Sequence, residues 1–244
     1  MKPCKVTGRV SSFQSLGAVD GPGIRFVVFL QGCPLRCIYC HNPETWDMQG
    51  GTEMMADEVF SKIRKYRNYF GKNGGVTVSG GEALLQIEFV EAIFSLCREA
   101  GIHTALDTSG TGCQDDEKLE NLLGLTDLVI CDLKFVNEED YVRNTGGSFK
   151  QVLHFLDLAG KHMIPVWIRQ VIVPGINDDE ESVKKLNEIS MAYENVERVE
   201  LLAFRNLCIP KYEKLGINFR LRDTPQASEE LISRLYEFIE KKSI

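Results

Sequence analysis

Short apolar runs rich in β-branched residues alternate with longer amphipathic runs along most of the chain. A bounded run of four to eight such residues is typical of a buried strand, and apolar residues at helical spacing are typical of a helix. The pattern predicts six strands, at residues 24–30, 76–78, 102–106, 127–133, 166–173 and 199–204. It predicts helices that follow them at 55–69, 87–99, 115–123, 152–161, 180–193 and 228–241.

This alternation indicates an α/β fold with a parallel sheet, because the strands are apolar on both faces and need helices to cover them. Right-handed crossovers would curl such a sheet into an open, partial barrel of six βα units. Ligands of these folds bind at the carboxyl ends of the strands. We expect residues 1–244 to form one domain, since no linker or low-complexity tract interrupts the pattern.

Polar and glycine-rich residues collect where the predicted strands end, which is where a barrel would place its site. The segments concerned are Gln31-Gly32-Cys33, Ser79-Gly80-Gly81-Glu82, Asp107-Thr108-Ser109-Gly110, Cys131-Asp132-Leu133-Lys134, Arg169 within the fifth strand, and Phe204-Arg205-Asn206.

Composition narrows the class of protein. Hydrophobic residues make up 43% of the chain and charged residues 26%, as in an ordinary packed domain. The net charge of −7 argues against a nucleic-acid-binding surface. No apolar run is long enough for a membrane span or a signal peptide, so we expect a cytoplasmic protein with no membrane partner. Eight cysteines in such a chain indicate metal binding or catalysis before disulfides.

Cys33, Cys37 and Cys40 place three thiols within eight residues. Spaced so closely, they must surround one object, and iron–sulfur clusters are held by cysteine thiolates, normally four. No fourth cysteine follows at a matching spacing, so three ligands on a four-iron cluster would leave one iron open, as catalytic metal sites do. The alternatives are buried thiols or a structural zinc site that takes His41 or Cys208 as its fourth ligand.

The stretch from Asp20 to Pro43 reads DGPGIRFVVFLQGC-x3-C-x2-CHNP, and it resembles the signature of the radical S-adenosylmethionine (SAM) activases of glycyl radical enzymes. The resemblance extends from about Gly8 to about Leu202 and implies a partial (β/α)6 TIM-like barrel of the radical SAM type. It also implies an oxygen-sensitive 4Fe-4S cluster on the three cysteines, with SAM chelating the open iron. Residues 46–53 contain no cysteine, so one cluster is expected.

For the reaction, the resemblance implies that reduced flavodoxin or ferredoxin supplies one electron and that SAM is cleaved to methionine and a 5′-deoxyadenosyl radical. That radical would remove a hydrogen from a glycine Cα of the partner, pyruvate formate-lyase or another glycyl radical enzyme. Two rival interpretations remain open. One is a radical SAM enzyme that acts on a small molecule, and the other is a non-enzymatic metal or redox module.

The resemblance also implies SAM-binding roles for residues beyond the cysteines. Gly80 and Gly81 would let the backbone approach the ligand, and Glu82 would accept its ammonium group. Tyr39 and His41 would lie against the adenine and the cluster. The alternative for the glycines and the glutamate is that they form an ordinary turn between a strand and a helix and bind no ligand.

Charged residues at later strand ends complete the predicted site. Asp107 and Asp132 would bind ribose hydroxyls or a cation, and Lys134, in the triple Asp132-Leu133-Lys134, would pair with the SAM carboxylate. A helix cap or a surface ion pair is the alternative for these groups.

Three further residues carry expectations. Arg169 requires a carboxylate partner, from the protein or from SAM, because an unpaired charge in an apolar strand is costly. Asp20 would lie near the incoming glycyl peptide, with simple turn chemistry as the alternative. Arg205 stands where the activases usually carry a SAM-binding histidine, and its role is open.

Overall fold

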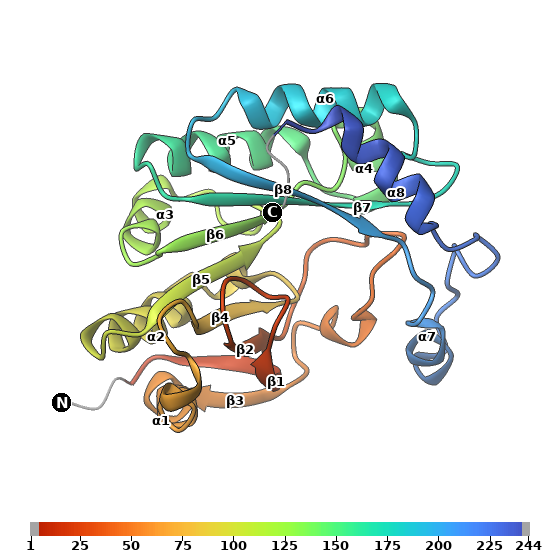
Figure 1. The fold of residues 1–244 in the computed structure, drawn as a ribbon. Helices are drawn as coiled ribbons and strands as arrows, with labels where there is room; N and C mark the ends of the chain where they lie inside the picture. The colour runs from red at the N-terminus through yellow and green to blue at the C-terminus, as the bar shows by residue number, and fades with distance from the viewer. Residues whose placement is uncertain (1–4, 241–244) are drawn as a thin grey trace.

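The computed structural model describes residues 5–240, which form one open sheet flanked by helices (Figure 1). The strand order is β3-β1-β2-β4-β5-β6-β7-β8. Strands β2 and β4 to β8 run parallel, while β1 pairs antiparallel with β2 and with β3. The strands are β1 Thr7–Gly17, β2 Arg25–Leu30, β3 Thr52–Met55, β4 Gly75–Gly80, β5 His103–Thr108, β6 Leu128–Asp132, β7 Val166–Ile172 and β8 Val196–Ala203.

The expected partial barrel is therefore confirmed, because the six parallel strands curve into a sheet whose edges, β3 and β8, do not pair. The six predicted strands correspond to β2 and β4 to β8, with ends that differ by a few residues. Helices cover the outer face of the sheet (Figure 1). They are α1 Ala56–Arg64, α2 Ile87–Glu99, α3 Asp116–Leu123, α4 Glu138–Thr145, α5 Phe149–Lys161, α6 Glu180–Met191 and α8 Glu229–Leu235. Helix α7 Ile209–Leu215 lies apart from these, beside the 3-10 turn η1 (Pro43–Thr45).

Two predicted helices are each divided into an α-helix and a 3-10 turn. The segment 55–69 forms α1 and then a separate 3-10 turn, η2 (Arg67–Tyr69). The segment 228–241 forms α8 and the 3-10 turn η4 (Tyr236–Phe238), and residue 241 lies outside the described range. The chain leaves the helix there because Ile239 takes an extended conformation and is fully buried in the core.

Four elements were not expected from the pattern: β1, β3, α4 and α7. Strand β1 is polar at most of its outward positions, so its apolar alternation is weak. Helix α4 carries end signals that could have revealed it. Asn137 caps its first turn by accepting from the N–H of Asp140, and Gly146 ends it in the left-handed conformation with φ +72°.

The parallel register brings distant polar residues to one edge of the sheet. Leu30 pairs with Gly80, Asp132 with Arg169, and Arg169 in turn with Glu200. The carboxyl ends of β2, β4, β5, β6, β7 and β8 consequently surround one space. No helix among residues 5–240 has the length and apolar character needed to cross a membrane.

Candidate active site

A cavity of about 430 Å³ opens at the carboxyl ends of the parallel strands. The structure brings nearly all of the predicted site residues to its wall. These are Asp20, Cys33, Cys37, Tyr39, Cys40, His41, Gly80, Gly81, Asp107, Asp132, Lys134, Arg169 and Arg205. Two predicted residues, Glu82 and Leu133, are buried behind the wall and do not line the cavity.

The loop that carries the three thiols, residues 31–47 (the thiol loop), is closed at its base by Gln31. The Gln31 side-chain amide donates to the carbonyls of Glu44 (2.9 Å) and Asp47 (2.7 Å), and the N–H of Gly32 donates to the carbonyl of Thr45 (2.9 Å). These bonds join the two ends of the loop and hold it in one shape.

The outer part of the thiol loop rests on the carboxyl end of α4. The N–H groups of Arg36 and Ile38 donate to the carbonyls of Thr145 (2.7 Å) and Asn144 (2.9 Å). Carbonyls in the last turn of a helix have no partner within the helix, and here the thiol loop supplies one. The unexpected helix α4 is thus part of the support for the site.

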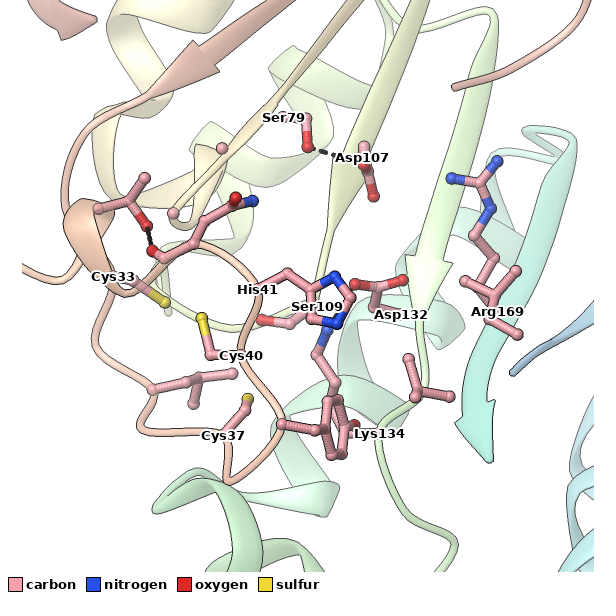
Figure 2. A pocket seen from close by; sticks show the side chains of 18 of the residues that line it. Cys33, Cys37, Cys40, His41, Ser79, Asp107, Ser109, Asp132, Lys134 and Arg169 are labelled. Carbon is pink, nitrogen blue, oxygen red and sulfur yellow. Dashed lines mark hydrogen bonds and ion pairs between the residues drawn. The ribbon is translucent and has the colours of Figure 1, made fainter. Parts of the chain in front are cut away.

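The sulfur atoms of Cys33, Cys37 and Cys40 lie together on one side of the cavity (Figure 2). Burial raises the pKa of Cys33 and of Cys37 to about 12 and also raises the pKa of Cys40. The thiols are therefore protonated until a metal displaces the protons, as in other thiolate metal sites.

The donor set fits a 4Fe-4S cluster, because three soft thiol ligands converge from one loop and polar groups face them across the cavity. Among residues 5–240, no three histidine, cysteine or acidic side chains are grouped as ligands of a single metal ion. The cysteines of an iron–sulfur cluster differ from such a group, since each binds a different iron.

Gly80 and Gly81 permit a close approach between backbone segments. Gly80 has φ +123°, and a Cβ there would lie 2.1 Å from the nitrogen of Leu30. A Cβ on Gly81 would lie 2.0 Å from the carbonyl oxygen of Gly32. The same oxygen accepts a hydrogen bond from the N–H of Glu82 (2.9 Å). The close approach is therefore to the start of the thiol loop, while both glycines also line the cavity.

The Glu82 carboxylate connects two strand ends. One oxygen accepts from the N–H of Leu84 and the hydroxyl of Thr108, and the other accepts from the N–H and the hydroxyl of Ser109. Burial raises the pKa of Glu82, and these hydrogen bonds oppose that rise. With both oxygens occupied and 2% exposure, Glu82 is placed to hold the ends of β4 and β5 together. The ammonium contact expected for it stays a prediction.

Opposite the thiols, two acidic side chains have partners of different kinds (Figure 2). Ser79 donates its hydroxyl to Asp107 (2.7 Å), and Lys134 donates to Asp132 (2.5 Å). Burial and the charge of Asp132 raise the pKa of Asp107 to about 7. The cavity therefore presents, near neutral pH, an acidic group that a cationic ligand would ionise.

Replacing Asp107 with asparagine is expected to stabilise the protein at pH 8 and not at pH 5. The folded-state pKa of Asp107 lies above its unfolded value, so the wild type loses stability as pH rises towards about 7, and asparagine does not. The free energy of unfolding of Asp107→Asn relative to wild type should rise by about 2 kcal/mol between pH 5 and pH 8. Urea unfolding at the two pH values measures this, and an equal difference at both would contradict it.

Arg169 has the protein carboxylate that its position required. Its Nε donates to Glu200 on β8 (2.5 Å), and its Nη2 donates to the carbonyl of Val19 (2.5 Å). Glu200 comes from a strand about thirty residues later in the chain, and a carboxylate facing the arginine in a paired strand was the signal that could have found it.

Asp20 lies at the cavity wall with its Oδ2 buried and without a hydrogen-bond partner among the described residues. Burial raises its pKa, while the nearby Arg169 and Arg25 oppose the rise. A buried carboxylate oxygen without a donor is costly, so Asp20 is suited to accept a hydrogen bond from a ligand in the cavity. Its place near the incoming peptide stays a prediction.

His41 and Arg205 connect the thiol loop to the end of β8. The His41 imidazole Nε2 lies 2.7 Å from the carbonyl oxygen of Arg205, and the Arg205 guanidinium donates to the carbonyl of Ala227 (2.7 Å). Arg205 thus lines the cavity and also ties down the segment that leads to α8. Tyr39 packs against Phe135, and its buried hydroxyl has no partner among the described residues.

Known proteins are similar to this chain in sequence and in fold. Residues 27–186 match the radical SAM superfamily. The pyruvate formate-lyase-activating enzyme of Clostridium pasteurianum is 46% identical over 237 residues, which cover 97% of this chain and 98% of that protein. The pyruvate formate-lyase 1-activating enzyme of Escherichia coli K12 is 42% identical over 237 residues, which cover 97% and 96%.

Solved structures agree on the fold. A domain of a pyruvate-formate lyase-activating enzyme from Bacteroides vulgatus has a TM-score of 0.58 at 24% identity, over 70% of this chain and 98% of that one. Streptococcus suis SuiB bound to its precursor peptide SuiA has a TM-score of 0.65 at 15% identity, over 87% and 44%. The chain is 42–46% identical to these activating enzymes over nearly its full length, and it has the thiol loop and the open barrel. It therefore belongs to the radical SAM superfamily and, within it, to the family of the pyruvate formate-lyase-activating enzymes.

Proposed function

We propose that this enzyme activates pyruvate formate-lyase by generating a radical on one of its glycine residues. The observation that carries the proposal is the cavity at the strand ends, where three thiols of one loop face a set of acidic and basic side chains. Relatives that share 42–46% of the sequence over nearly the full length are named as activating enzymes of pyruvate formate-lyase. The alternative of a non-enzymatic module does not account for these polar groups.

Cys33, Cys37 and Cys40 would hold the 4Fe-4S cluster and leave one iron for SAM. When bound, the cluster would supply one electron to cleave a sulfonium C–S bond of SAM into methionine and the 5′-deoxyadenosyl radical, and that radical would take a hydrogen atom from the glycine. The protein supplies orientation and exclusion of water.

Several groups of the chain are suited to hold SAM beside the thiols. Asp107 would bind the ribose hydroxyls of SAM or a cation, and Lys134 would pair with the SAM carboxylate. Asp132 keeps Lys134 in place and raises its pKa against the effect of burial, so the amine stays charged. Tyr39, which lines the cavity and is packed against the buried ring of Phe135, would exclude water on the side of the thiol loop.

A reduced flavodoxin or ferredoxin is the electron donor that we propose for the cluster. The partner in the reaction is a protein, so its glycine must reach the cavity from outside the barrel. Glycine suits this because, without a Cβ, its backbone enters a narrow space.

Electron paramagnetic resonance tests the proposal. We expect protein loaded anaerobically with iron and sulfide, reduced and mixed with SAM and inactive pyruvate formate-lyase, to produce a protein-based glycyl radical. Pyruvate formate-lyase with its radical-bearing glycine replaced by alanine is the control and should show none. A reduced-cluster signal that changes with SAM but produces no glycyl radical would retain the radical SAM chemistry and reject this partner.

A further inference from the structure

Residues 18–24 (the Asp20 loop) connect β1 with β2 and reach from the cavity wall to the surface. Asp20 lines the cavity, whereas the adjacent Val19 is 74% exposed. The loop turns at Gly21 and Gly23, which have φ values of +126° and +66°. A polypeptide that enters the cavity from outside meets this loop, because the loop forms part of the cavity wall and also part of its outer rim.

Side chains of the barrel hold the backbone of the Asp20 loop at three successive points. Arg169 Nη2 donates to the carbonyl of Val19 (2.5 Å). Thr77 Oγ1 donates to the carbonyl of Asp20 (2.6 Å), and Arg25 Nη1 donates to the carbonyl of Pro22 (3.5 Å). The last of these bonds is long, so the firm contacts come from Arg169 and Thr77.

Arg25 orients Thr77. Its Nε donates to Thr77 Oγ1 (2.9 Å), which leaves the Thr77 hydroxyl proton free to point at the carbonyl of Asp20. Arg25 itself is fully buried and donates to the carbonyls of Val76 and His103. Hydrogen bonds from a fixed guanidinium therefore determine the direction of the Thr77 hydroxyl.

The cost of this arrangement argues that it serves a purpose. All of the hydrogen bonds that the described residues make to Arg25 use neutral acceptors, and none is a carboxylate. A fully buried charge without a hydrogen-bonded counter-charge is expensive, and an apolar side chain would fill the same space at lower cost. What the arginine adds is a fixed set of donors beneath the Asp20 loop.

These contacts lie away from the thiols. Arg25, Gly75 and His103 pair across the amino ends of β2, β4 and β5, at the edge of the sheet opposite the one that carries the cavity's cysteines. A change at Thr77 or Arg25 therefore alters the Asp20 loop without touching the thiol loop or the Asp132–Lys134 pair.

We propose that Arg25, acting through Thr77, is a positioning residue that fixes the Asp20 loop in the shape that admits the partner's polypeptide, independently of SAM cleavage. The proposal rests on the proposed function, because it concerns the protein partner. It assigns a role in partner recognition to two residues, Arg25 and Thr77, that do not line the cavity.

Thr77→Val tests it, because valine keeps the shape and strand propensity of threonine and removes both hydrogen bonds. With wild-type iron content, we expect kcat/KM for glycyl radical formation on pyruvate formate-lyase to fall about tenfold, mainly through KM for the partner. SAM cleavage by dithionite-reduced enzyme without the partner should be unchanged, and amide hydrogen exchange in residues 18–24 should be faster. Thr77→Ser, which restores the hydroxyl, is the matched control and should recover the wild-type values.

The outcomes separate the two proposals. Unchanged radical formation in Thr77→Val, or an equal fall in SAM cleavage without the partner, would overturn the positioning role and leave the proposed function intact. A wild-type enzyme that forms no radical on pyruvate formate-lyase would overturn the proposed function itself. If Thr77→Val does not fold, Gly21→Ala distorts the same loop at its φ of +126°, and the new Cβ has no contact closer than 3.4 Å. For this variant too, radical formation on the partner should fall while SAM cleavage without the partner stays unchanged.

Discussion

Replacing Cys37 with serine is expected to abolish cluster binding and SAM cleavage while it leaves the fold nearly intact. A serine hydroxyl is a poor substitute for a soft thiolate on iron, so loss of one of three ligands should leave the loaded iron content near background. The thiol loop should keep its shape, because its supports are backbone hydrogen bonds from Arg36 and Ile38 to α4. Iron and sulfide content, with reduced-state paramagnetic resonance, measures the loss.

Cys113→Ser is the matched control, since Cys113 is partly exposed, lies outside the cavity and undergoes the same chemical change. It should load iron and cleave SAM like the wild type. Thermal unfolding of both variants before loading should lie close to that of the wild type. Full iron loading and activity in Cys37→Ser would reject the assignment of the cluster to this loop.

The strands and helices that were predicted correctly carry strong local signals. Helix α2 occupies the predicted range, with Phe89, Ile93, Phe94 and Cys97 all buried on one face. Strand β7 is apolar on both sides except for Arg169 and Gln170, and Arg169 has its charge partner on the neighbouring strand. In contrast, β1 and β3 lie at one edge of the sheet and bury few of their residues, so their pairing is decided by tertiary context.

The candidate site, too, has a part that the sequence predicts and a part that it does not. The three cysteines and the strand-end residues follow from spacing and from the rule that parallel strands end at one edge. The surroundings of Glu82 do not, because Thr108 and Ser109 come from the end of the next strand, 26 and 27 residues later. The role of Thr77 depends likewise on Arg25, 52 residues earlier. Sequence patterns report which residues reach the site, but the contacts between them depend on packing.

Replacing Gly81 with alanine should damage both the stability of the protein and its site. The new Cβ would lie 2.0 Å from the carbonyl oxygen of Gly32 and 3.1 Å from the Cβ of Cys33, and a backbone atom cannot move aside as a flexible side chain can. Either β4 shifts away from β2 or the start of the thiol loop moves. We expect a loss of about 3 kcal/mol in the free energy of unfolding. We also expect a fall of about a hundredfold in SAM cleavage, because Cys33 is displaced.

Gly124→Ala tests whether this loss is specific to the position. Gly124 follows α3 with helical angles, φ −60° and ψ −15°, and a Cβ there meets its nearest atoms at 3.4 and 3.5 Å. Alanine should be neutral or slightly stabilising at that site, because it reduces the freedom of the unfolded chain. Urea unfolding and iron content should therefore change only for Gly81→Ala. If Gly81→Ala binds iron and cleaves SAM like Gly124→Ala, the close contact between the end of β4 and the thiol loop does not position the cluster ligands.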